Sequence, residues 1–459
     1  MRRRGRDVSS RDASRDSKLR ILAVTFAAVV LPLILILLAT LTAGVLAYGT
    51  DAGWAQFNHG IDFIIWSRRL QWPLIVTALL LCVALLGLVI AGKRRAWWLI
   101  ALLPILALFL HRFVTGPART VEVMEDPQFV DAEQATFLQD RDYVVGVRFA
   151  DGAYAFPYSV IYGAPAIVVS DRERRMMLMW SPFANRALAY NVGREVRGRD
   201  LEIVSTPANA LLLYNSRLGQ FINGITGLTT RRERPLGFRE PLQTLKLPWA
   251  TWRALSPETR VMSPLDLRWR TQPNKPVLPK FPMPRSRPEL ADARPVCVVA
   301  TTQPIAVPAE AVKQTPLNLT AGKTPVLLFR DSATSALRAF DRHVDEDLSP
   351  RFSVASDPKH PDVALVDSDT NTEWSAAGVA EALPKDAKPK RLAPIPVEDE
   401  LYWGVMKFWY PELTLVGPDA LAAASTAGEQ VVAPPTNGAK EKAPQPPKRR
   451  KRSVATPAR

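Results

Sequence analysis

The side chains of this chain that could carry out chemistry are few and lie far apart in the sequence. Ser181 could serve as a nucleophile, but none of the 4 histidines lies near it in the sequence, and a serine needs an adjacent base. Asp331, Asp367 and Asp369 could together bind a hard cation, because such cations prefer carboxylate oxygens. A turn serine and solvated acidic turns are the commoner roles of these residues. We therefore predict no catalytic residue, no metal site and no cofactor.

The positive charge of the chain is concentrated outside its central part. The formal net charge is +15, to which residues 1–20 contribute +5, residues 21–116 contribute +4 and residues 417–459 contribute +5. A nucleic-acid-binding domain needs a basic face of its own, and the central part, residues 117–416, contributes only +1. The distribution excludes nucleic acid as the partner and is typical of a membrane protein.

Three apolar runs occupy residues 21–48, 70–92 and 97–114. A helix needs about 20 apolar residues to cross the hydrocarbon core of a bilayer. The third run is short, but Arg112 at its end can extend its charged group to the membrane interface. The sequence therefore predicts a membrane anchor of three helices within residues 21–115.

Basic residues flanking these runs predict the orientation. Residues 1–20 contain eight Lys or Arg and the link at 93–95 contains three, whereas the link before residue 70 contains only Arg68 and Arg69. Short cytoplasmic segments carry the excess of Lys and Arg. We therefore expect a bacterial inner-membrane protein with a cytoplasmic N-terminus and a periplasmic main domain.

The region after the apolar runs has the pattern of a β-rich domain. Val144–Phe149 and Ala153–Phe156 flank an Asp-Gly dipeptide, which favours a hairpin turn with positive φ at those two residues. Short apolar runs bounded by Gly, Asn, Asp and Pro follow at spacings typical of strands. The predicted fold class is three N-terminal transmembrane α-helices followed by a β-rich (α+β) soluble domain of two diverged repeats.

Changes in composition along the chain, such as the eight prolines between residues 263 and 296, divide it into six expected segments. They are a basic cytoplasmic N-terminus (1–20), the anchor (21–115), a first lobe (117–262), a Pro-rich linker (263–300), a second lobe (301–416) and a disordered basic tail (417–459). The tail ends in a basic cluster at 448–452, which we expect to contact anionic lipid or an envelope polymer.

The two lobes resemble each other in the order of their motifs. Leu213-Tyr214-Asn215 parallels Leu365-Val366-Asp367, and Trp249 precedes Pro257 by eight residues, as Trp403 precedes Pro411. Order and spacing agree within a few residues, which predicts an internal duplication.

Several motifs also carry a family resemblance. They are Glu125-Asp126-Pro127-Gln128-Phe129-Val130, Val145-Gly146-Val147 with Gly152 and Ala155-Phe156-Pro157, the segment from Tyr214 to Gly227, and the segment from Asp367 to Trp374. In this order they resemble the prokaryotic family catalogued as domain of unknown function 3179. We expect Asp367, Asp369 and Trp374 of the second copy, and Asn215 of the first, to face a ligand.

The chain departs from the family at its most reactive positions. The family typically has a His-Glu-Ile-Val-Asn-Asp stretch and then a Cys-Pro-Leu-Cys stretch. Here Ala166 stands at the histidine position, and Ser181 and Ala184 stand at the two cysteine positions. Imidazole and thiolate bind soft metals or carry nucleophilic chemistry, and alanine can do neither.

These observations favour a non-catalytic inner-membrane protein whose periplasmic domain binds a protein partner or a cell-envelope ligand. Two alternatives remain open. One is an envelope enzyme, hydrolase-like and dependent on carboxylates or a metal. The other is a subunit of a membrane assembly that makes its main contacts through the helices.

Overall fold

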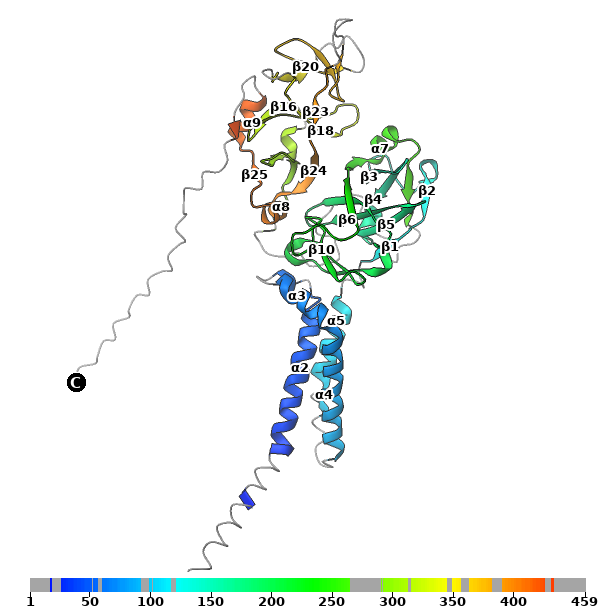
Figure 1. The fold of residues 1–459 in the computed structure, drawn as a ribbon, viewed down its shortest axis with the longest axis vertical. Helices are drawn as coiled ribbons and strands as arrows, with labels where there is room; N and C mark the ends of the chain where they lie inside the picture. Colours follow the sequence, from blue (N-terminus) through cyan, green and yellow to red (C-terminus); the bar gives the residue numbers. More distant parts are fainter. Residues whose placement is uncertain are drawn as a thin grey trace, which may run out of the picture.

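A computed structural model of the chain describes residues 17–18, 26–51, 53–56, 60–91, 99–100, 102–116, 121–264, 290, 292–312, 315–344, 349–355, 363–381, 390–425 and 431–432. A bundle of apolar helices stands at one end of the molecule and a β-rich domain at the other (Figure 1). The predicted basic N-terminus, most of the Pro-rich linker and the basic cluster at 448–452 lie outside the described residues.

Two helices are long and apolar enough to cross a membrane, α2 (Leu31–Tyr48) and α4 (Gln71–Ala91). A π-helical turn, η1 (Phe26–Val30), precedes α2. The third expected span is the shorter helix α5 (Leu102–Thr115), whose 14 residues extend about 21 Å, less than the hydrocarbon thickness of about 30 Å. Of the three predicted spans, two are therefore helices long and apolar enough to cross a membrane, and the third is shorter than predicted.

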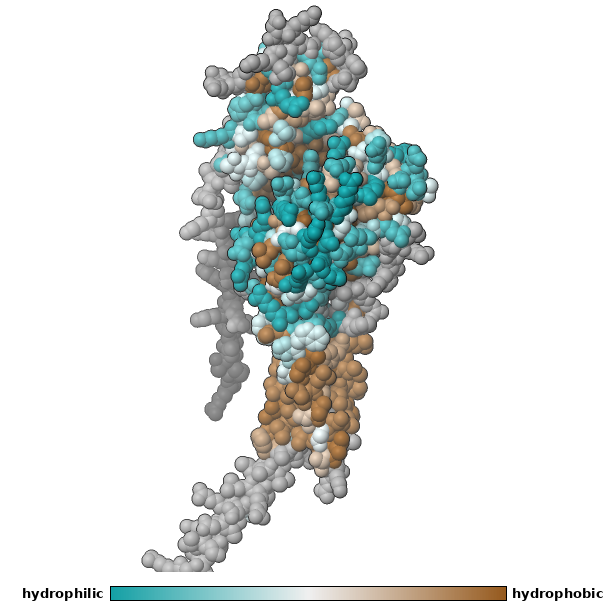
Figure 2. All heavy atoms as spheres, turned by 45° about the vertical axis from the view of Figure 1, so that its right-hand side comes forward, coloured by the Kyte–Doolittle hydropathy of each residue, from teal (hydrophilic) through white to brown (hydrophobic). Residues whose placement is uncertain are grey.

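The surface of the helical bundle is apolar. Leu37 on α2, Leu80 on α4 and Leu106 on α5 are each at least 60% exposed. Figure 2 shows an apolar band that covers the bundle and ends where the hydrophilic domain begins. Leucines that point outward all around a helix pair are typical of helices that lie in lipid, and they indicate that the N-terminal region associates with a membrane.

A short helix joins the bundle to the domain. α3 (Gly60–Arg69) follows the helical turn η2 (Trp54–Gln56) and packs Ile64 against Phe221 and neighbouring apolar side chains of the domain. Arg68 at the end of α3 forms an ion pair with Glu202. The domain is thus fixed to the helices by apolar and charged contacts, not by a tether alone.

The first lobe contains two five-stranded sheets, ordered β1-β5-β6-β7-β11 and β12-β3-β4-β13-β2, and a three-stranded sheet ordered β10-β9-β8. Its strands are β1 (Val123–Glu125), β2 (Phe129–Asp131), β3 (Tyr143–Phe149), β4 (Gly152–Pro157), β5 (Ala166–Asp171), β6 (Arg174–Ser181), β7 (Arg186–Val192), β8 (Leu201–Ser205), β9 (Leu212–Asn215), β10 (Gln220–Asn223), β11 (Phe238–Leu242), β12 (Thr244–Pro248) and β13 (Arg260–Met262). Its helices are η5 (Ala132–Gln134), α6 (Tyr158–Ile161), η6 (Gly198–Asp200), η7 (Pro207–Asn209) and α7 (Trp249–Leu255).

The second lobe contains sheets ordered β24-β14-β15-β25, β23-β18-β17-β16-β26 and β19-β20-β21-β22. Its strands are β14 (Pro295–Val299), β15 (Ile305–Pro308), β16 (Leu317–Ala321), β17 (Thr324–Arg330), β18 (Leu337–Asp341), β19 (Phe352–Val354), β20 (Val363–Asp367), β21 (Glu373–Ser375), β22 (Ala380–Glu381), β23 (Ala393–Pro394), β24 (Val397–Tyr402), β25 (Thr414–Leu415) and β26 (Val431–Val432). Its helices are η11 (Ala309–Val312), α8 (Trp403–Trp409) and α9 (Pro418–Ser425).

The predicted hairpin is present as β3 and β4, which pair from Val144 with Pro157 to Phe149 with Gly152. The positive φ lies at Ala150 (53°) and not at Gly152, because the two-residue loop is Ala150-Asp151. The turn is therefore one residue earlier than the sequence suggested.

Two predicted boundaries are wrong. The second lobe begins inside the expected linker, since Pro295–Val299 is strand β14, whose apolar run follows directly on the prolines. The expected disordered tail begins with α9, a helix that buries Ala424 in the core of the second lobe. An alanine-rich stretch favours helix, and here a face of small side chains fits against β16.

The largest hydrophobic core extends through both lobes. Phe156 and Trp180 of the first lobe belong to the same buried cluster as Val296, Leu401 and Met406 of the second. The two lobes therefore share their interior, and their relative position is set by packing.

Candidate functional site

Two of the three residues predicted to face a ligand in the second lobe are buried, and the third is exposed. Asp367 is 1% exposed, and its carboxylate accepts hydrogen bonds from the backbone N–H of Asp369 and Thr370 and from the Trp374 Nε1. Trp374 is also 1% exposed. Asp369 lies on the surface of the same turn. Both oxygens of Asp367 are used to hold this turn, so the structure gives it a structural role.

Asn215 has the equivalent role in the first lobe. It ends β9, as Asp367 ends β20, and its Oδ1 accepts hydrogen bonds from the backbone N–H of Arg217 and Leu218 at 3.1 and 3.0 Å. Asn215 is 1% exposed. The shared motif that suggested a binding surface is therefore a turn-forming element, because Asn and Asp side chains stabilise such turns through their oxygens.

The three degenerate positions lie inside the first lobe. Ala166, Ser181 and Ala184 are all 0% exposed. Ser181 Oγ accepts a long hydrogen bond of 3.4 Å from the backbone N–H of Leu211, and a Cβ at Gly224 would lie 2.9 Å from it. A hydroxyl enclosed in this way has no room for a substrate, which disfavours Ser181 as a nucleophile.

The turn that contains Ser181 and Ala184 contacts the second lobe. The backbone N–H of Tyr402 donates to the carbonyl oxygen of Ala184 at 3.0 Å. Asn185, with φ of 49°, donates from Nδ2 to the carbonyl oxygen of Glu400 at 2.7 Å and accepts from the hydroxyl of Tyr158 at 2.8 Å. The segment at which the resemblance places two cysteines is therefore part of the contact between the lobes.

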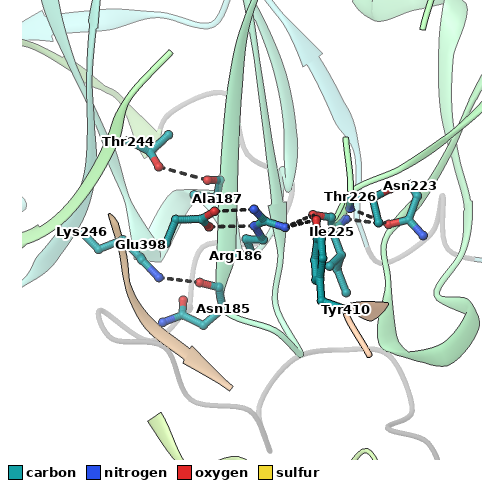
Figure 3. A network of polar contacts seen from close by, with 10 residues as sticks. All are labelled: Asn185, Arg186, Ala187, Asn223, Ile225, Thr226, Thr244, Lys246, Glu398 and Tyr410. Carbon is teal, nitrogen blue, oxygen red and sulfur yellow. Dashed lines mark hydrogen bonds and ion pairs between the residues drawn. The ribbon is translucent and has the colours of Figure 1, made fainter. Parts of the chain in front are cut away.

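A charged network surrounds this turn. Arg186 at the start of β7 forms a bidentate ion pair with Glu398 of β24, with 2.7 Å between Nε and Oε2 (Figure 3). On its other side the Arg186 guanidinium donates to the hydroxyl of Tyr410 and to the carbonyl oxygen of Ile225. Burial alone would lower the pKa of Arg186, but Glu398 and Tyr410 outweigh it and raise the pKa.

Lys246 supplies a second cation from β12. Its residue is 8% exposed, and Nζ donates one hydrogen bond, of 2.7 Å, to the carbonyl oxygen of Asn185 (Figure 3). Burial lowers the pKa of Lys246, and the carboxylates of Asp399, Glu400 and Glu398 oppose the shift. An ammonium group has three N–H donors, so two of them have no hydrogen-bond acceptor among the described residues.

Lys246 borders a cavity of about 470 Å³ between the lobes. Tyr143 and Lys246 contribute from the first lobe, and Arg330 and Glu400 from the second. The remaining charged side chains of its lining are Arg294 and Glu310. A volume of this size suits a small ligand, and the mixture of cations and carboxylates suits a polar ligand that carries both kinds of charge.

The backbone beside this cavity contains a bulge. Asp399 and Glu400 of β24 lie opposite the single residue Cys297 of β14, and Glu400 has φ of 50°. The Asp399 carboxylate pairs with Arg330 at 2.8 Å and accepts a hydrogen bond from the Cys297 thiol at 3.2 Å. Bulges direct side chains towards sites, and a non-glycine residue in the left-handed region costs about 1–2 kcal/mol.

No group of three or more His, Cys, Asp or Glu residues that could hold a metal ion occurs in the described part of the chain. The sequence did not identify Lys246, Arg186 or the bulge. Two signals were available: a single lysine in the apolar strand Leu245-Lys246-Leu247, and three successive acidic residues at 398–400 inside a strand. Both break the expected pattern of a half-buried strand.

The fold and this cavity define a two-lobed, β-rich domain that follows apolar helices and has a charged cleft between its lobes. A family model described as a protein of unknown function, DUF3179, matches residues 122–413. The match covers more than half of the chain, so the chain belongs to this family. No curated protein and no solved structure matches the chain.

Proposed function

We propose that this chain is a non-catalytic, membrane-anchored binding protein, and that its β-rich domain binds a small cell-envelope ligand in the cavity beside Lys246. The observation that carries the proposal is a buried ammonium group at a cavity between the lobes, with two N–H donors that no described residue accepts. Leaving donors of a charged group without acceptors is costly, and a ligand oxygen would relieve the cost.

The lining also predicts the type of ligand. Lys246, Arg294 and Arg330 can bind a carboxylate or phosphate, while Glu310 and Glu400 can bind an ammonium group. A short zwitterionic molecule, such as a dipeptide, has both groups at the separation of a few bonds. The proposal excludes covalent steps, because Ala166, Ser181 and Ala184 offer neither a base nor a thiolate.

The bundle geometry supports a third membrane crossing. α2 ends and α4 begins near the domain, and α5 lies along α2 and ends near the domain (Figure 1). The chain must return from the far end of α4 to reach the domain. We propose that α5 makes the larger part of this crossing, so that the N-terminus and the domain lie on opposite sides of the membrane. The basic residues at 1–20 and 93–95 favour the cytoplasm for the N-terminus, and therefore the periplasm of a bacterial inner membrane for the domain.

The strand orders support an internal duplication. Reading from one edge, β11-β7-β6-β5 corresponds to β23-β18-β17-β16 in the same chain order. In both sheets a further strand pairs parallel beyond β5 or β16, although β1 is the first strand of its lobe and β26 is the last. Likewise β12-β3-β4-β13 corresponds to β24-β14-β15-β25, again with a parallel last pair. We propose that the two lobes are diverged copies of one unit, whose interface has become the binding site.

A binding measurement tests the proposed function. Full-length protein in phosphatidylcholine nanodiscs is titrated with alanyl-alanine and with glutamate by isothermal calorimetry. We expect saturable binding of at least one of them, and we expect Lys246→Met to weaken it at least tenfold, because a hydrogen bond to a charged group contributes about 1.5–3 kcal/mol.

Lys407→Met is the matched control. Lys407 is an exposed lysine of α8 that donates to the carbonyl oxygens of Pro411 and Leu413, away from the cavity. The Lys407→Met variant should bind both probes as the unaltered protein does. Binding that survives Lys246→Met unchanged, or the absence of binding for both probes, would contradict the proposal.

The orientation has its own test. A reporter active only in the periplasm is fused after Lys93 or after Val416. We expect activity for the second fusion and none for the first, because only the second lies beyond all three proposed crossings. The reverse pattern would overturn the proposed topology without affecting the cavity.

A further inference from the structure

A second groove, of about 400 Å³, lies between the lobes. It is bordered by the first residues of β12 and by α7 from the first lobe, and by β18, β23 and β24 from the second. α7, β18 and β23 lie on the part of the domain away from the helices (Figure 1). A bilayer around the helices does not reach this groove, so its occupant comes from solution.

The lining of this groove is mainly apolar. Leu245, Leu255 and Ile395 are partly exposed there, above the buried rings of Trp252 and Phe340. The Trp252 ring lies directly on Gly146 of β3: a Cβ at position 146 would lie 2.3 Å from the ring. The apolar floor is therefore built by close packing, and it favours the apolar part of a ligand.

The charged side chains of the groove are all arginines. They are Arg148, Arg338 and Arg391, and no carboxylate of a described residue belongs to the lining. In the cavity beside Lys246, by contrast, Glu310 and Glu400 accompany the cations. Three guanidinium groups on one groove repel each other, and the repulsion is relieved when an anion lies among them.

These arginines are weakly paired. Arg148 donates to two neutral acceptors, the carbonyl oxygen of Leu255 at 3.2 Å and the Ser256 hydroxyl at 3.4 Å. Arg338 reaches Asp331 only at 3.5 Å, and its buried Nε has no hydrogen-bond partner. The Arg391 side chain forms no hydrogen bond or ion pair with a described residue. Free guanidinium donors in a fixed plane suit the two oxygens of a carboxylate or phosphate.

We propose that this groove binds a soluble amphiphilic anion, a carboxylate or phosphate carried on an apolar body. The anionic group pairs with the arginines, led by Arg338 and Arg391, and the apolar body lies over Leu245 and Ile395. This site is separate from the cavity beside Lys246, and neither depends on the other.

The test uses the full-length protein in phosphatidylcholine nanodiscs and phenyl phosphate as the probe, with heats from empty nanodiscs subtracted. We expect saturable binding that is at least tenfold tighter than that of inorganic phosphate, which lacks the apolar body. Benzyl alcohol, which lacks the charge, should bind at least tenfold more weakly. Raising the salt concentration should weaken binding, because partly exposed charges are screened.

Two variants locate the probe. Arg391→Gln changes an exposed side chain and is expected to leave the fold intact while weakening phenyl phosphate binding about fivefold; Arg338→Gln should weaken it at least tenfold. Arg194→Gln is the matched control, since Arg194 is a surface arginine, 73% exposed, that pairs with Glu173 away from the groove.

Several results would overturn the proposal. They are no saturable binding of phenyl phosphate, equal binding of inorganic phosphate, or equal losses in Arg391→Gln and Arg194→Gln. Lys246→Met distinguishes the two sites: it should weaken binding of the zwitterionic probe at least tenfold and leave phenyl phosphate binding unchanged. Failure of one site therefore does not decide the other.

Discussion

Two helices of seven residues, each headed by tryptophan, show how the lobes differ. α7 packs Trp249 and Trp252 mainly against buried residues of its own lobe, and both are 1% exposed. α8 instead places Val405 and Met406 in the core that the first lobe dominates. The same kind of short helix therefore packs against its own lobe in the first lobe, and attaches the second lobe to the first.

The contacts of Trp409 extend this difference. Its Nε1 donates to the carbonyl oxygen of Ala208 in the first lobe at 3.0 Å. Trp252, in contrast, donates from Nε1 to Thr259 within its own lobe at 2.9 Å. The helix of the second lobe therefore attaches that lobe to the first.

The largest expected effect comes from removing the attachment. Met406→Ala should lower the free energy of unfolding by about 3–4 kcal/mol, because a buried methionine at 1% exposure leaves a cavity that the shared core cannot refill. Urea unfolding of the full-length protein in detergent, followed by tryptophan fluorescence, measures the change. Amide exchange should increase in both lobes.

Phe408→Ala on the same helix is the control, since Phe408 is 46% exposed. It should change stability by about 1 kcal/mol or less. If exchange increased only in the second lobe of Met406→Ala, the idea of a core shared by both lobes would be wrong.

The next effect concerns the ion pair across the lobes. Arg186→Met should cost about 2–3 kcal/mol, because it leaves Glu398 without its partner at a partly buried site. Arg253→Met removes an exposed ion pair with Asp140 inside the first lobe and should cost less than about 1 kcal/mol. Equal losses of unfolding free energy in the two variants would show that the inter-lobe pair has no special weight.

The two equivalent turns offer a smaller and sharper comparison. Asp367→Ala should cost about 2 kcal/mol, because it leaves the buried Trp374 Nε1 without an acceptor as well as opening the turn. Asn215→Ala removes only hydrogen bonds from turn N–H groups and should cost about 1 kcal/mol. Thermal unfolding of the two variants gives the order, and the reverse order would contradict the assigned turn contacts.

The smallest effect is a pH dependence in the second lobe. Burial, with Asp399 nearby, raises the pKa of the Cys297 thiol well above its ordinary value of 9.0. The unfolded thiol ionises first, so this contribution to stability is complete below pH 9 and is lost as the pH rises above it. Unfolding midpoints between pH 8 and pH 10 should fall less steeply in Cys297→Ala. Parallel slopes would refute this role.

The sequence predicted well what depends on local pattern. The hairpin at Val144–Pro157 follows from alternating apolar residues around a short turn, and the structure contains it. The family match confirms the resemblance that the ordered motifs indicated. The third apolar run begins at Trp97, before the start of α5 at Leu102, so the helix is shorter than the length of the run suggested.

The candidate site was beyond sequence reasoning for a physical reason. Asp367 and Lys246 are each a single charge in an apolar strand, and only their partners distinguish a turn from a cavity. The partners of Asp367 lie within seven residues of it, whereas those of Lys246 lie far away in the chain. The Lys246 ammonium donates to the carbonyl oxygen of Asn185, and three carboxylates of β24 oppose the lowering of its pKa. Contacts between lobes are invisible to a pattern that extends over ten residues.

The docking of α3 beneath the three-stranded sheet has a mechanical consequence. Ile64 and the Arg68–Glu202 ion pair connect the helical bundle to the domain at two points, one apolar and one charged. Free rotation of the domain would need a single point of contact, so two contacts make the domain rotate together with the helices. A rotation of the helices would therefore rotate the domain with them and change the direction that both openings between the lobes face.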